Sequence, residues 1–276
     1  MGVLYRYIDE EIVFHHTLDE CPDPSEYSMH THDRLELFFF LTGKGVFHVE
    51  GSTYELKSGD LLLFEQGESH YIELDPSQPY ERVAIHFSKS AIPAPFHADL
   101  LCAFSQRTAG QGNLYRRSDF ADSSVSLYLQ KLIEPHDNPR MQITALLLPI
   151  LMELQKAFAR RAHKQVSAEE TAVMRALRYI NAHLYEPLHL EEISRQAFIS
   201  KPQLCRMFKA ETGSTVGGYI TAKRLLRAKE MLDAGEAATV TAAACGFGEY
   251  TTFYRAFSRR YGYAPTKSGT SAVKET

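Results

Sequence analysis

Two stretches near the end of the chain follow one pattern, Arg206-Met207-Phe208-Lys209-Ala210-Glu211-Thr212-Gly213 and Arg255-Ala256-Phe257-Ser258-Arg259-Arg260-Tyr261-Gly262. Each reads Arg-x-Phe followed by four residues and a glycine, and the two are 49 residues apart (255 − 206 = 49). At this offset Leu204 corresponds to Phe253, and Phe198 corresponds to Phe247. The repeat indicates that one unit of supersecondary structure occurs twice.

Each copy predicts a short helix, a tight turn and a second helix, which is the helix-turn-helix arrangement of many DNA-binding proteins. In the first copy we expect Ser200 to cap a second helix over residues 201–210. Leu204 and Phe208 are four residues apart and face the core, so Arg206 lies on the outward face. An outward arginine suits a guanine edge or a phosphate in the major groove. For one copy alone a solvated basic face is an equal alternative, but the repeat favours DNA binding.

Residues 171–266 resemble the double helix-turn-helix domain of AraC-type transcription regulators. The resemblance is carried by positions that occur in the family's order: 190–193, Phe208, Gly213, Tyr219, Arg224, Leu225, Ala228, Leu232, Gly246, Phe247, Arg255, Phe257, Gly262 and Pro265. It implies that bases are read by Pro202, Cys205 and Arg206 in the first copy and by Tyr250, Thr251 and Arg255 in the second. The outward helix faces add Lys201, Gln203, Lys209, Thr252 and Arg259 to the expected DNA contacts. Double-stranded DNA and RNA polymerase are the partners that the resemblance implies.

The second copy departs from the family pattern in its core. Ala238 and Thr241 stand where the family has two large aliphatic residues. We therefore expect the second copy to be loosely packed and to be the weaker reader of DNA.

Charge is divided unevenly along the chain. Residues 1–166 carry 15 Lys+Arg and 23 Asp+Glu, a balance of −8, whereas residues 167–276 carry 15 and 11, a balance of +4. A polyanion is therefore expected to bind the C-terminal part. The chain has four cysteines with no C-x-x-C spacing, which favours a reducing cytosol. The longest apolar run, 143–154, is too short to span a bilayer and the first residues lack the pattern of a signal peptide, so we expect a cytoplasmic protein without a membrane partner.

The N-terminal part has an all-β pattern. Short apolar runs at 35–42, 46–49, 53–56, 60–64, 71–74 and 82–87 are separated by glycine-containing turns. Short strands at this regular spacing predict a barrel or a sandwich. Residues 1–25 are expected to form an arm with one short strand at 12–14.

Three potential metal ligands share one face of a predicted strand. His30, His32 and Glu36 have the same parity, and His70 on a later strand is a fourth candidate. Imidazoles combined with a carboxylate are typical ligands of a divalent first-row transition metal. The pattern also resembles the cupin family: H-x-H-x-x-x-E followed by six residues and a glycine fits the first cupin motif, and the second is matched by Gly59, Gly67 and His70.

Sensor domains of AraC-type regulators are cupins, so the resemblance implies a small-molecule effector, by analogy a carbohydrate. The expected effector contacts are His30, His32, Glu36, Phe38 and His70. Without metal, the histidines and Glu36 act as hydrogen-bonding groups of a ligand pocket. Phe38 either stacks on the effector or belongs to the barrel core, because its strand is apolar on both faces.

Helical periodicity follows residue 92. One helix is expected to be capped by Asp119, and another to run from Pro139 to residue 161. These helices either pair with a second subunit, as the family resemblance implies, or pack back on the barrel. We expect a homodimer and keep packing on the barrel as the alternative.

The sequence therefore predicts a multidomain chain, an N-terminal β-barrel (cupin, double-stranded β-helix) followed by an all-α double helix-turn-helix. The expected regions are a sensor domain with its arm at 1–92, a helical linker and dimerisation region at 93–166, a DNA-binding domain at 167–268 and a frayed tail at 269–276. The predicted function is an effector-controlled transcription regulator, an activator and not an enzyme. The alternatives are a metal-dependent cupin enzyme or metal sensor fused to a DNA-binding module, and an architectural DNA-binding protein with an inert barrel.

Overall fold

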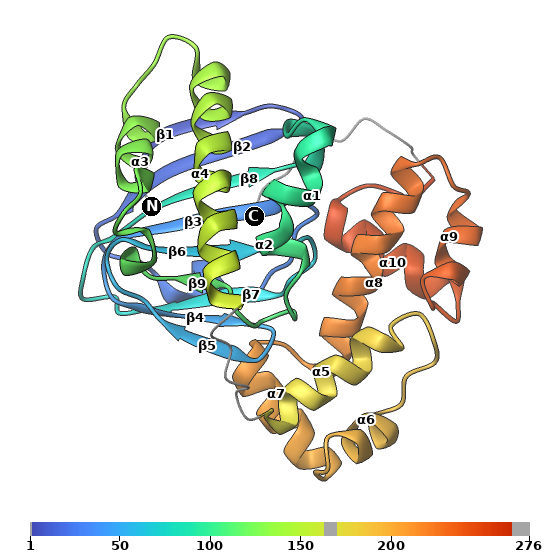
Figure 1. The fold of residues 1–276 in the computed structure, drawn as a ribbon. Helices are drawn as coiled ribbons and strands as arrows, with labels where there is room; N and C mark the ends of the chain where they lie inside the picture. The colour runs from blue at the N-terminus through green and yellow to red at the C-terminus, as the bar shows by residue number, and fades with distance from the viewer. Residues whose placement is uncertain (1, 163–169, 267–276) are drawn as a thin grey trace. The chain divides into compact units, whose positions relative to one another are not determined.

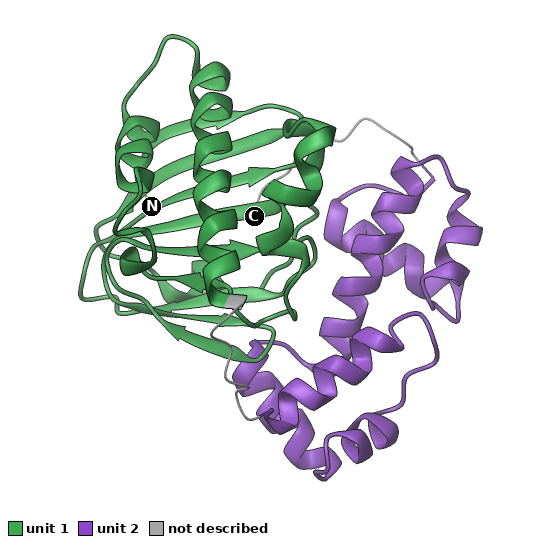
Figure 2. Cartoon of the chain, in the orientation of Figure 1, with its two compact units in different colours: residues 1–169 green, residues 170–276 purple. Residues whose placement is uncertain are grey.

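The computed structural model describes residues 2–162 and 170–266. The chain divides into two compact units, Met1–Glu169 and Glu170–Thr276 (Figure 2). The expected boundary at 166/167 and the expected tail at 269–276 lie outside the described residues. Within the described residues, none of the helices has the length and hydropathy needed to cross a membrane.

The N-terminal unit contains two antiparallel sheets that lie face to face, in agreement with the barrel or sandwich that the strand pattern predicted (Figure 1). The larger sheet has the strand order β1-β2-β8-β3-β6-β9, and the smaller has the order β5-β4-β7. The strands are β1 Gly2–Ile8, β2 Ile12–Asp19, β3 Leu35–Thr42, β4 Gly45–Val49, β5 Ser52–Glu55, β6 Asp60–Phe64, β7 His70–Leu74, β8 Tyr80–Phe87 and β9 Leu114–Tyr115. The strands expected between residues 35 and 87 are present, with ends shifted by at most two residues.

The expected N-terminal arm is instead part of the large sheet. Strands β1 and β2 form a hairpin, and β2 pairs with β8 from Ile12–Phe87 to Asp19–Tyr80. Ile12 and Phe14 are 1% and 0% exposed, so this strand supplies core side chains. A free arm was the wrong prediction, because the partner of β2 lies more than 60 residues away in sequence and no local pattern identifies it.

Strand β3 separates two hydrophobic cores. Leu35, Leu37 and Phe39 belong to one cluster together with the helices that cover the large sheet. Phe38 and Phe40 belong to the other cluster, which lies between the two sheets. The strand is apolar throughout because both of its faces are buried.

The helices after residue 92 pack on the large sheet. They are α1 His97–Leu100, α2 Cys102–Ser105, α3 Val125–Ile133 and α4 Pro139–Ala162. Short 3-10 turns lie among them at Ala94–Phe96 and Arg117–Phe120, and earlier in the unit at Pro24–Tyr27 and Lys89–Ala91. In α4, Ile143, Ile150 and Leu154 are completely buried in the core of this sheet. Residues 93–162 are therefore part of the N-terminal unit rather than a separate linker region. Helix α3 begins after Ser124 and not at Asp119, whose carboxylate instead accepts the backbone N–H of Arg116.

The C-terminal unit contains six described helices, α5 Ala172–Ala182, α6 Leu190–Gln196, α7 Lys201–Thr212, α8 Val216–Asp233, α9 Ala238–Ala244 and α10 Tyr250–Tyr261. One core cluster unites α5, α6, α7 and the start of α8. A second cluster unites the end of α8 with α9 and α10. Each cluster is the core of one helix-turn-helix, and α8 belongs to both.

The two copies have turns of different length. Ile199 N–H donates to the Ser194 carbonyl, and Phe247 N–H donates to the Ala242 carbonyl in the same way. Ile199 is therefore the counterpart of Phe247, and the expected match between Phe198 and Phe247 is wrong. One additional residue in the second turn accounts for the difference, since the offset is 48 before the turn (247 − 199 = 48) and 49 after it.

Candidate nucleic-acid interface and sensor site

Helix α7 presents its predicted DNA contacts to solvent. Leu204 and Phe208 are 0% exposed, and their burial orients the opposite side of the helix outward. The exposed residues on this side are Lys201, Pro202, Gln203, Cys205, Arg206 and Lys209. This arrangement is suited to inserting the helix into a DNA groove, with its cations near phosphates.

Two of these residues have partners within the C-terminal unit. Lys201 forms an ion pair with Glu191, and the Gln203 side-chain oxygen accepts the Ser200 amide at 3.2 Å in a capping box. Both interactions stabilise the start of α7. The outward cations that remain for DNA are Arg206 and Lys209.

Helix α10 repeats this arrangement with one exception. Phe253 and Phe257 are buried, and the exposed residues are Thr251, Thr252, Arg255 and Arg259. Tyr250 is half-buried, and its ring centroid lies 5.9 Å from that of Phe253. Tyr250 therefore contributes to the core as well as to the outward face.

Arg224 on the connecting helix α8 has a structural role that the sequence did not reveal. Its guanidinium donates to the carbonyl oxygens of Leu184, Glu186 and Gly246, each at 2.7 Å. The first two carbonyls precede α6, and the third lies in the turn of the second copy. Arg224 thus connects the two helix-turn-helix copies and is not one of the solvent-facing cations of α8.

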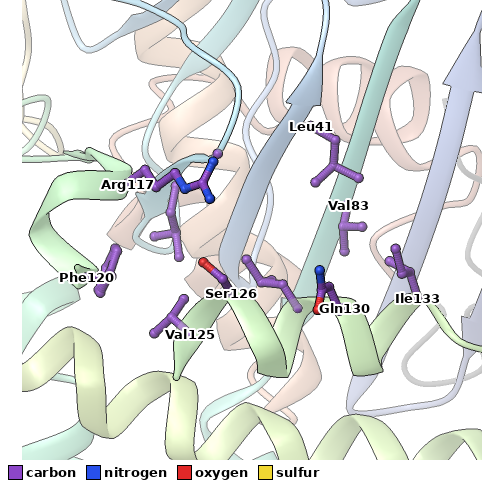
Figure 3. Close-up of a pocket in the computed structure, with 11 residues that line it drawn as sticks. Leu41, Val83, Arg117, Phe120, Val125, Ser126, Gln130 and Ile133 are labelled. Atoms are coloured by element: carbon purple, nitrogen blue, oxygen red, sulfur yellow. The ribbon is translucent and has the colours of Figure 1, made fainter. Parts of the chain in front are cut away.

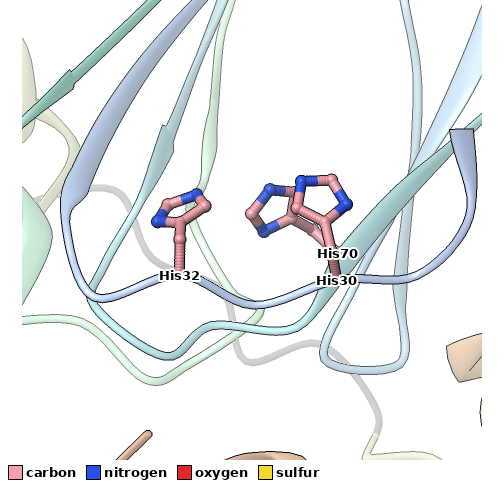
Figure 4. Close-up of side chains that lie close together, drawn as sticks. All are labelled: His30, His32 and His70. Atoms are coloured by element: carbon pink, nitrogen blue, oxygen red, sulfur yellow. The ribbon is translucent and has the colours of Figure 1, made fainter. Parts of the chain in front are cut away.

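The predicted metal ligands converge although they do not share one strand. Only Glu36 lies in β3, whereas His32 lies in the loop before β3 and His30 forms an isolated bridge with His70 through two 3.1 Å backbone hydrogen bonds. The ring centroids of His30 and His70 are 4.4 Å apart, and those of His32 and His70 are 5.1 Å apart. Figure 4 shows the three rings together above the loops that carry them. One nitrogen from each ring lies within 4.8 Å of the others.

Backbone carbonyls determine which nitrogen faces the centre of this cluster. The Nδ1 atoms of His30, His32 and His70 lie 3.0, 2.8 and 2.9 Å from the carbonyl oxygens of Ser28, Arg34 and Glu68. A carbonyl only accepts, so each Nδ1 donates. Nε2 then carries the lone pair in a neutral ring, and it can donate to the Glu36 carboxylate only when the ring is protonated. The Nε2 of His70 is buried without a hydrogen-bond partner among the described residues. Histidines that bind metals are held in this way by their second nitrogen.

The Glu36 carboxylate completes the site, and it has a further histidine neighbour, His86, that we did not predict. Oε2 of Glu36 lies 2.9 Å from Nε2 of His32, 3.3 Å from that of His70 and 3.5 Å from that of His86. Burial alone would raise the pKa of Glu36, but the charge of His86 and hydrogen bonds from the histidines outweigh it and lower the pKa well below its ordinary range. His86 is directly opposite Glu36 in the β3–β8 register, and only this register brings it to the site.

Desolvation lowers the pKa of two of the imidazoles. Desolvation lowers the pKa of His30 to about 3, and the nearby His70 and His32 add to this effect. The pKa of His86 is also lowered by burial, against the opposing influence of Glu36. Neutral imidazoles can offer a lone pair to a metal ion or accept a hydrogen bond from a ligand.

Phe38 occupies the core between the sheets. It is 0% exposed, and its ring meets that of Phe47 edge to face with centroids 4.9 Å apart. The structure therefore places it in the barrel core, the second of the two roles considered for it.

A row of basic residues, the cationic row, crosses the face of the large sheet that carries Glu36 and Phe38. Its permanent cations are Arg6 and Arg82, and its histidines are His15 and His86. The register pairs Arg6 with His15 between β1 and β2, and Thr17 with Arg82 between β2 and β8. Burial lowers the pKa of His15 to about 4, and the positive charges of His86, Arg6 and Arg82 lower it further. The sequence does not indicate that these residues lie together, because they come from three strands.

An apolar cavity lies on the other face of the large sheet. It has a volume of about 210 Å³ and is lined by Leu41, Gly59, Leu61, Val83, Arg117, Phe120, Val125, Ser126, Leu129, Gln130 and Ile133 (Figure 3). Arg117 is the cation in this lining. The cavity is separated from the histidine cluster by the strands themselves.

Comparison with known proteins identifies both units. Residues 193–268 match a family described as "Helix-turn-helix domain", and residues 17–100 match one described as "AraC-like ligand binding domain". The chain is 21% identical over 285 residues to the Msm operon regulatory protein of Streptococcus mutans, covering 97% of each chain. It is 21% identical over 215 residues to the lactose operon transcription activator of Staphylococcus xylosus, covering 75% of this chain and 72% of the relative. A crystal structure of ToxT from Vibrio cholerae with an unsaturated fatty acid has 11% identity, covers 95% of both chains and superposes with a TM-score of 0.42.

Proposed function

Because this chain belongs to the AraC-type transcription regulators, with a ligand-binding domain followed by a helix-turn-helix DNA-binding domain, we propose that it activates transcription from sites read by both α7 and α10. The observation that carries this proposal is the duplicated outward face, in which Arg206 and Arg255 follow the same pattern beside buried phenylalanines. Relatives named as activators support the direction of the effect. The four described cysteines are free thiols, in keeping with our placement of the protein in the cytoplasm.

The DNA half of the proposal is tested by selecting binding sites from random DNA with the full chain. The selected site is then placed upstream of a promoter and transcribed with purified RNA polymerase. We expect one preferred site and increased transcript. Decreased transcript would make the protein a repressor, and the lack of any preferred site would favour an architectural role.

We propose that the effector is a carbohydrate bound on the inner face of the N-terminal sheets. The lactose operon activator is one of the relatives that support this class. His30, His32, Glu36 and His70 provide polar groups beside an interior of aromatic and aliphatic side chains. The test is a thermal-shift screen of sugars on the full chain, followed by the transcription assay with each sugar that binds.

A divalent first-row transition metal fits the histidine cluster. We propose that it is held by Nε2 of His30, His32 and His70 and by the Glu36 carboxylate, since three Nδ1 atoms already donate to carbonyls. Bound there, the metal would act as a Lewis acid and attract oxygen atoms of a ligand. A metal-responsive regulator is the second candidate function, and the same ligand set supports it.

Elemental analysis of the untagged chain tests the metal. We expect about one metal per chain, strongly reduced in His30→Ala and in His70→Ala. The matched control is His136→Ala, because His136 is an exposed histidine of the same unit. Wild-type protein that folds and carries no metal after growth in metal-supplemented medium would leave a metal-free ligand pocket.

We also propose a homodimer formed through the outward face of α4. Its inward face is occupied by the sheet, but Met141 and Met152 on the outward side are 56% and 50% exposed. They are separated by 11 residues, or three helical turns, so they lie on one face. Family resemblance implies that such a helix pairs with a second copy.

A further inference from the structure

The cationic row on the inner face of the large sheet forms a continuous group of side chains. Residues that are directly opposite in an antiparallel sheet project to the same side. His15 is opposite Ala84, so its diagonal neighbours on β8 are Arg82 and His86. Arg6 is opposite His15 on the edge strand. The ring centroids of His15 and His86 are 6.3 Å apart.

Arg82 lies among aromatic rings and lacks a complete set of polar partners. Its guanidinium carbon lies 5.9 Å from the ring centroids of Tyr27 and Phe38 and 5.8 Å from that of Tyr80. Its Nε is buried without a hydrogen-bond partner among the described residues. Aromatic faces attract a cation but do not accept its N–H groups in plane. A buried donor without an acceptor is destabilising, and an oxyanion is the ligand that would satisfy it.

The charge around this row is opposite to the charge of the unit. Residues 1–166 have a balance of −8, yet Arg6, His15, Arg82 and His86 lie together. The nearest carboxylate to His86 in this row is that of Glu36, which is already engaged by three histidines. Arg6 and Arg82 are the permanent positive charges of this row, and together they favour a negative ligand.

Solvent has access to the row from one side. Arg6 is exposed, His15, Arg82 and His86 are half-buried, and Glu36 is buried. The exposure of these side chains therefore decreases along the strand order β1-β2-β8-β3 (Figure 1). A ligand entering from the β1 side would meet Arg6 first, and then His15 and Arg82.

We propose that the effector carries a negative charge, as a sugar acid or a sugar phosphate, and that its oxyanion is bound by the Arg82 guanidinium with His15 and Arg6 beside it. The inference rests on the proposed function, in which the inner face binds a carbohydrate effector. It adds a charge requirement that neutral sugars do not meet. The planar guanidinium pairs with carboxylate or phosphate through two parallel hydrogen bonds.

The experiment compares matched sugars on the full chain by calorimetry and thermal shift. The probes are glucose with glucuronate and glucose 6-phosphate, and galactose with galacturonate and galactose 6-phosphate. We expect an acid or a phosphate to bind and the neutral parent to bind at least roughly 10-fold more weakly, as expected for loss of a charge-assisted hydrogen bond. The acid and phosphate arms distinguish the two sources of the oxyanion.

Arg82→Gln should weaken the anion roughly 10- to 100-fold and leave the weak binding of the neutral parent unchanged. Arg82→Lys keeps the charge and should show a smaller loss, which also covers the case in which the glutamine variant does not fold. Arg117→Gln is the control, because Arg117 lines the cavity on the other face of the sheet. If Arg117→Gln rather than Arg82→Gln abolishes binding, the inference is wrong.

Equal binding of neutral and anionic sugars would overturn the charge requirement and leave the proposed effector function intact. Failure of every anionic probe to bind would likewise overturn it. If neutral sugars also fail to bind or to change transcription, the carbohydrate part of the proposed function fails too.

Discussion

Single side chains in the N-terminal unit are oriented by backbone carbonyls. Three histidines donate through Nδ1 to carbonyl oxygens of nearby residues, so the direction of each Nε2 is set locally. The backbone bridge between His30 and His70 then brings the rings together. Arg224 in the C-terminal unit follows the same rule, because three carbonyls determine the position of its guanidinium. In both cases the main chain, and not another side chain, determines where the functional group points.

Arg206 is expected to contact DNA directly, so its substitution should change DNA binding. We expect Arg206→Ala to reduce the affinity for the selected site by about 1–3 kcal/mol and to relax specificity at one base position. Arg195→Ala is the control, because Arg195 is exposed on α6 and pairs with Glu192 at 2.9 Å. Fluorescence anisotropy on the selected site and on its single-base variants measures both effects. Uniform weakening on all DNA would make Arg206 a phosphate contact.

His15 makes the folded chain sensitive to acid. Its folded-state pKa of about 4 is below its ordinary value of 6.5, mainly because of burial and then because of nearby positive charges. Between pH 6.5 and 4 the unfolded chain therefore binds a proton that the folded chain does not, and stability decreases as the pH falls. His15→Gln should lose less stability than wild type between pH 7 and pH 5 in urea unfolding. His136→Gln, at an exposed position, should behave like wild type, and an unchanged slope in His15→Gln would contradict the prediction.

At the scale of secondary-structure elements, the two helix-turn-helix copies differ in how well their helices are finished. Helix α7 begins with the Ser200 capping box, whereas Glu249, the N-cap of its counterpart α10, makes no side-chain cap hydrogen bond. The first helix of each copy lacks such a bond at its N-cap, His189 in α6 and Ala237 in α9. A missing cap costs about 1 kcal/mol. In the turn of the second copy Gly246 has a φ of 77°, and in the first copy the corresponding Phe198 has a φ of 58°. A positive φ is unfavourable for a residue that has a side chain, but not for glycine. The second copy thus has a weaker cap, and the first copy has a strained turn.

Thr241 carries the element-scale prediction. It is 0% exposed, and its hydroxyl has no hydrogen-bond partner among the described residues. Thr241→Val should stabilise the C-terminal unit by about 1 kcal/mol, because it removes a buried donor without changing the shape of the side chain. Thr212→Val is the matched control and should destabilise, since the Thr212 hydroxyl donates to Phe208 at 2.7 Å. Thermal unfolding followed by circular dichroism compares the two, and destabilisation by Thr241→Val would show that the hydroxyl has a partner.

At the scale of the whole molecule, helix α4 is the element through which we propose that two copies of the chain associate. One face of α4 packs on the sheet, whereas Met141 and Met152 on the other face are exposed. The predicted packing on the barrel and the proposed dimer are therefore compatible. The −8 balance of residues 1–166 and the +4 balance of residues 167–276 keep the DNA surface on the helical unit.

The dimer proposal predicts the effect of a charge on the outward face of α4. Met152→Glu should weaken association by about 2 kcal/mol or more, because it buries a carboxylate in an apolar contact. Phe96→Glu is the control, since Phe96 has the same 50% exposure but lies outside α4. Sedimentation velocity over a range of concentrations measures both variants. A wild-type chain that stays monomeric at micromolar concentration, or a Met152→Glu dimer of unchanged strength, would refute this interface.

The local elements of this protein were determined by the sequence itself. A short apolar run placed β3 at 35–42, and the Ser200 cap and the Arg-x-Phe repeat placed α7 and α10. Such signals act over a few residues, and strand parity, helix caps and the periodicity of buried side chains are properties of short segments. The convergence of His30, His32, Glu36 and His70 was also predicted, through motif spacing.

Contacts between distant segments were decided only by the tertiary structure. His86 joins Glu36 because β8 pairs with β3 in one register, and Arg82 joins His15 because β2 is inserted between β1 and β8. A shift of one residue in either pairing would turn these side chains to the other face of the sheet. The register results from burying both faces of the large sheet at once, and the sequence of one strand does not contain that information. The cationic row, and with it the charge expected of the effector, is therefore a property of the assembled sheet.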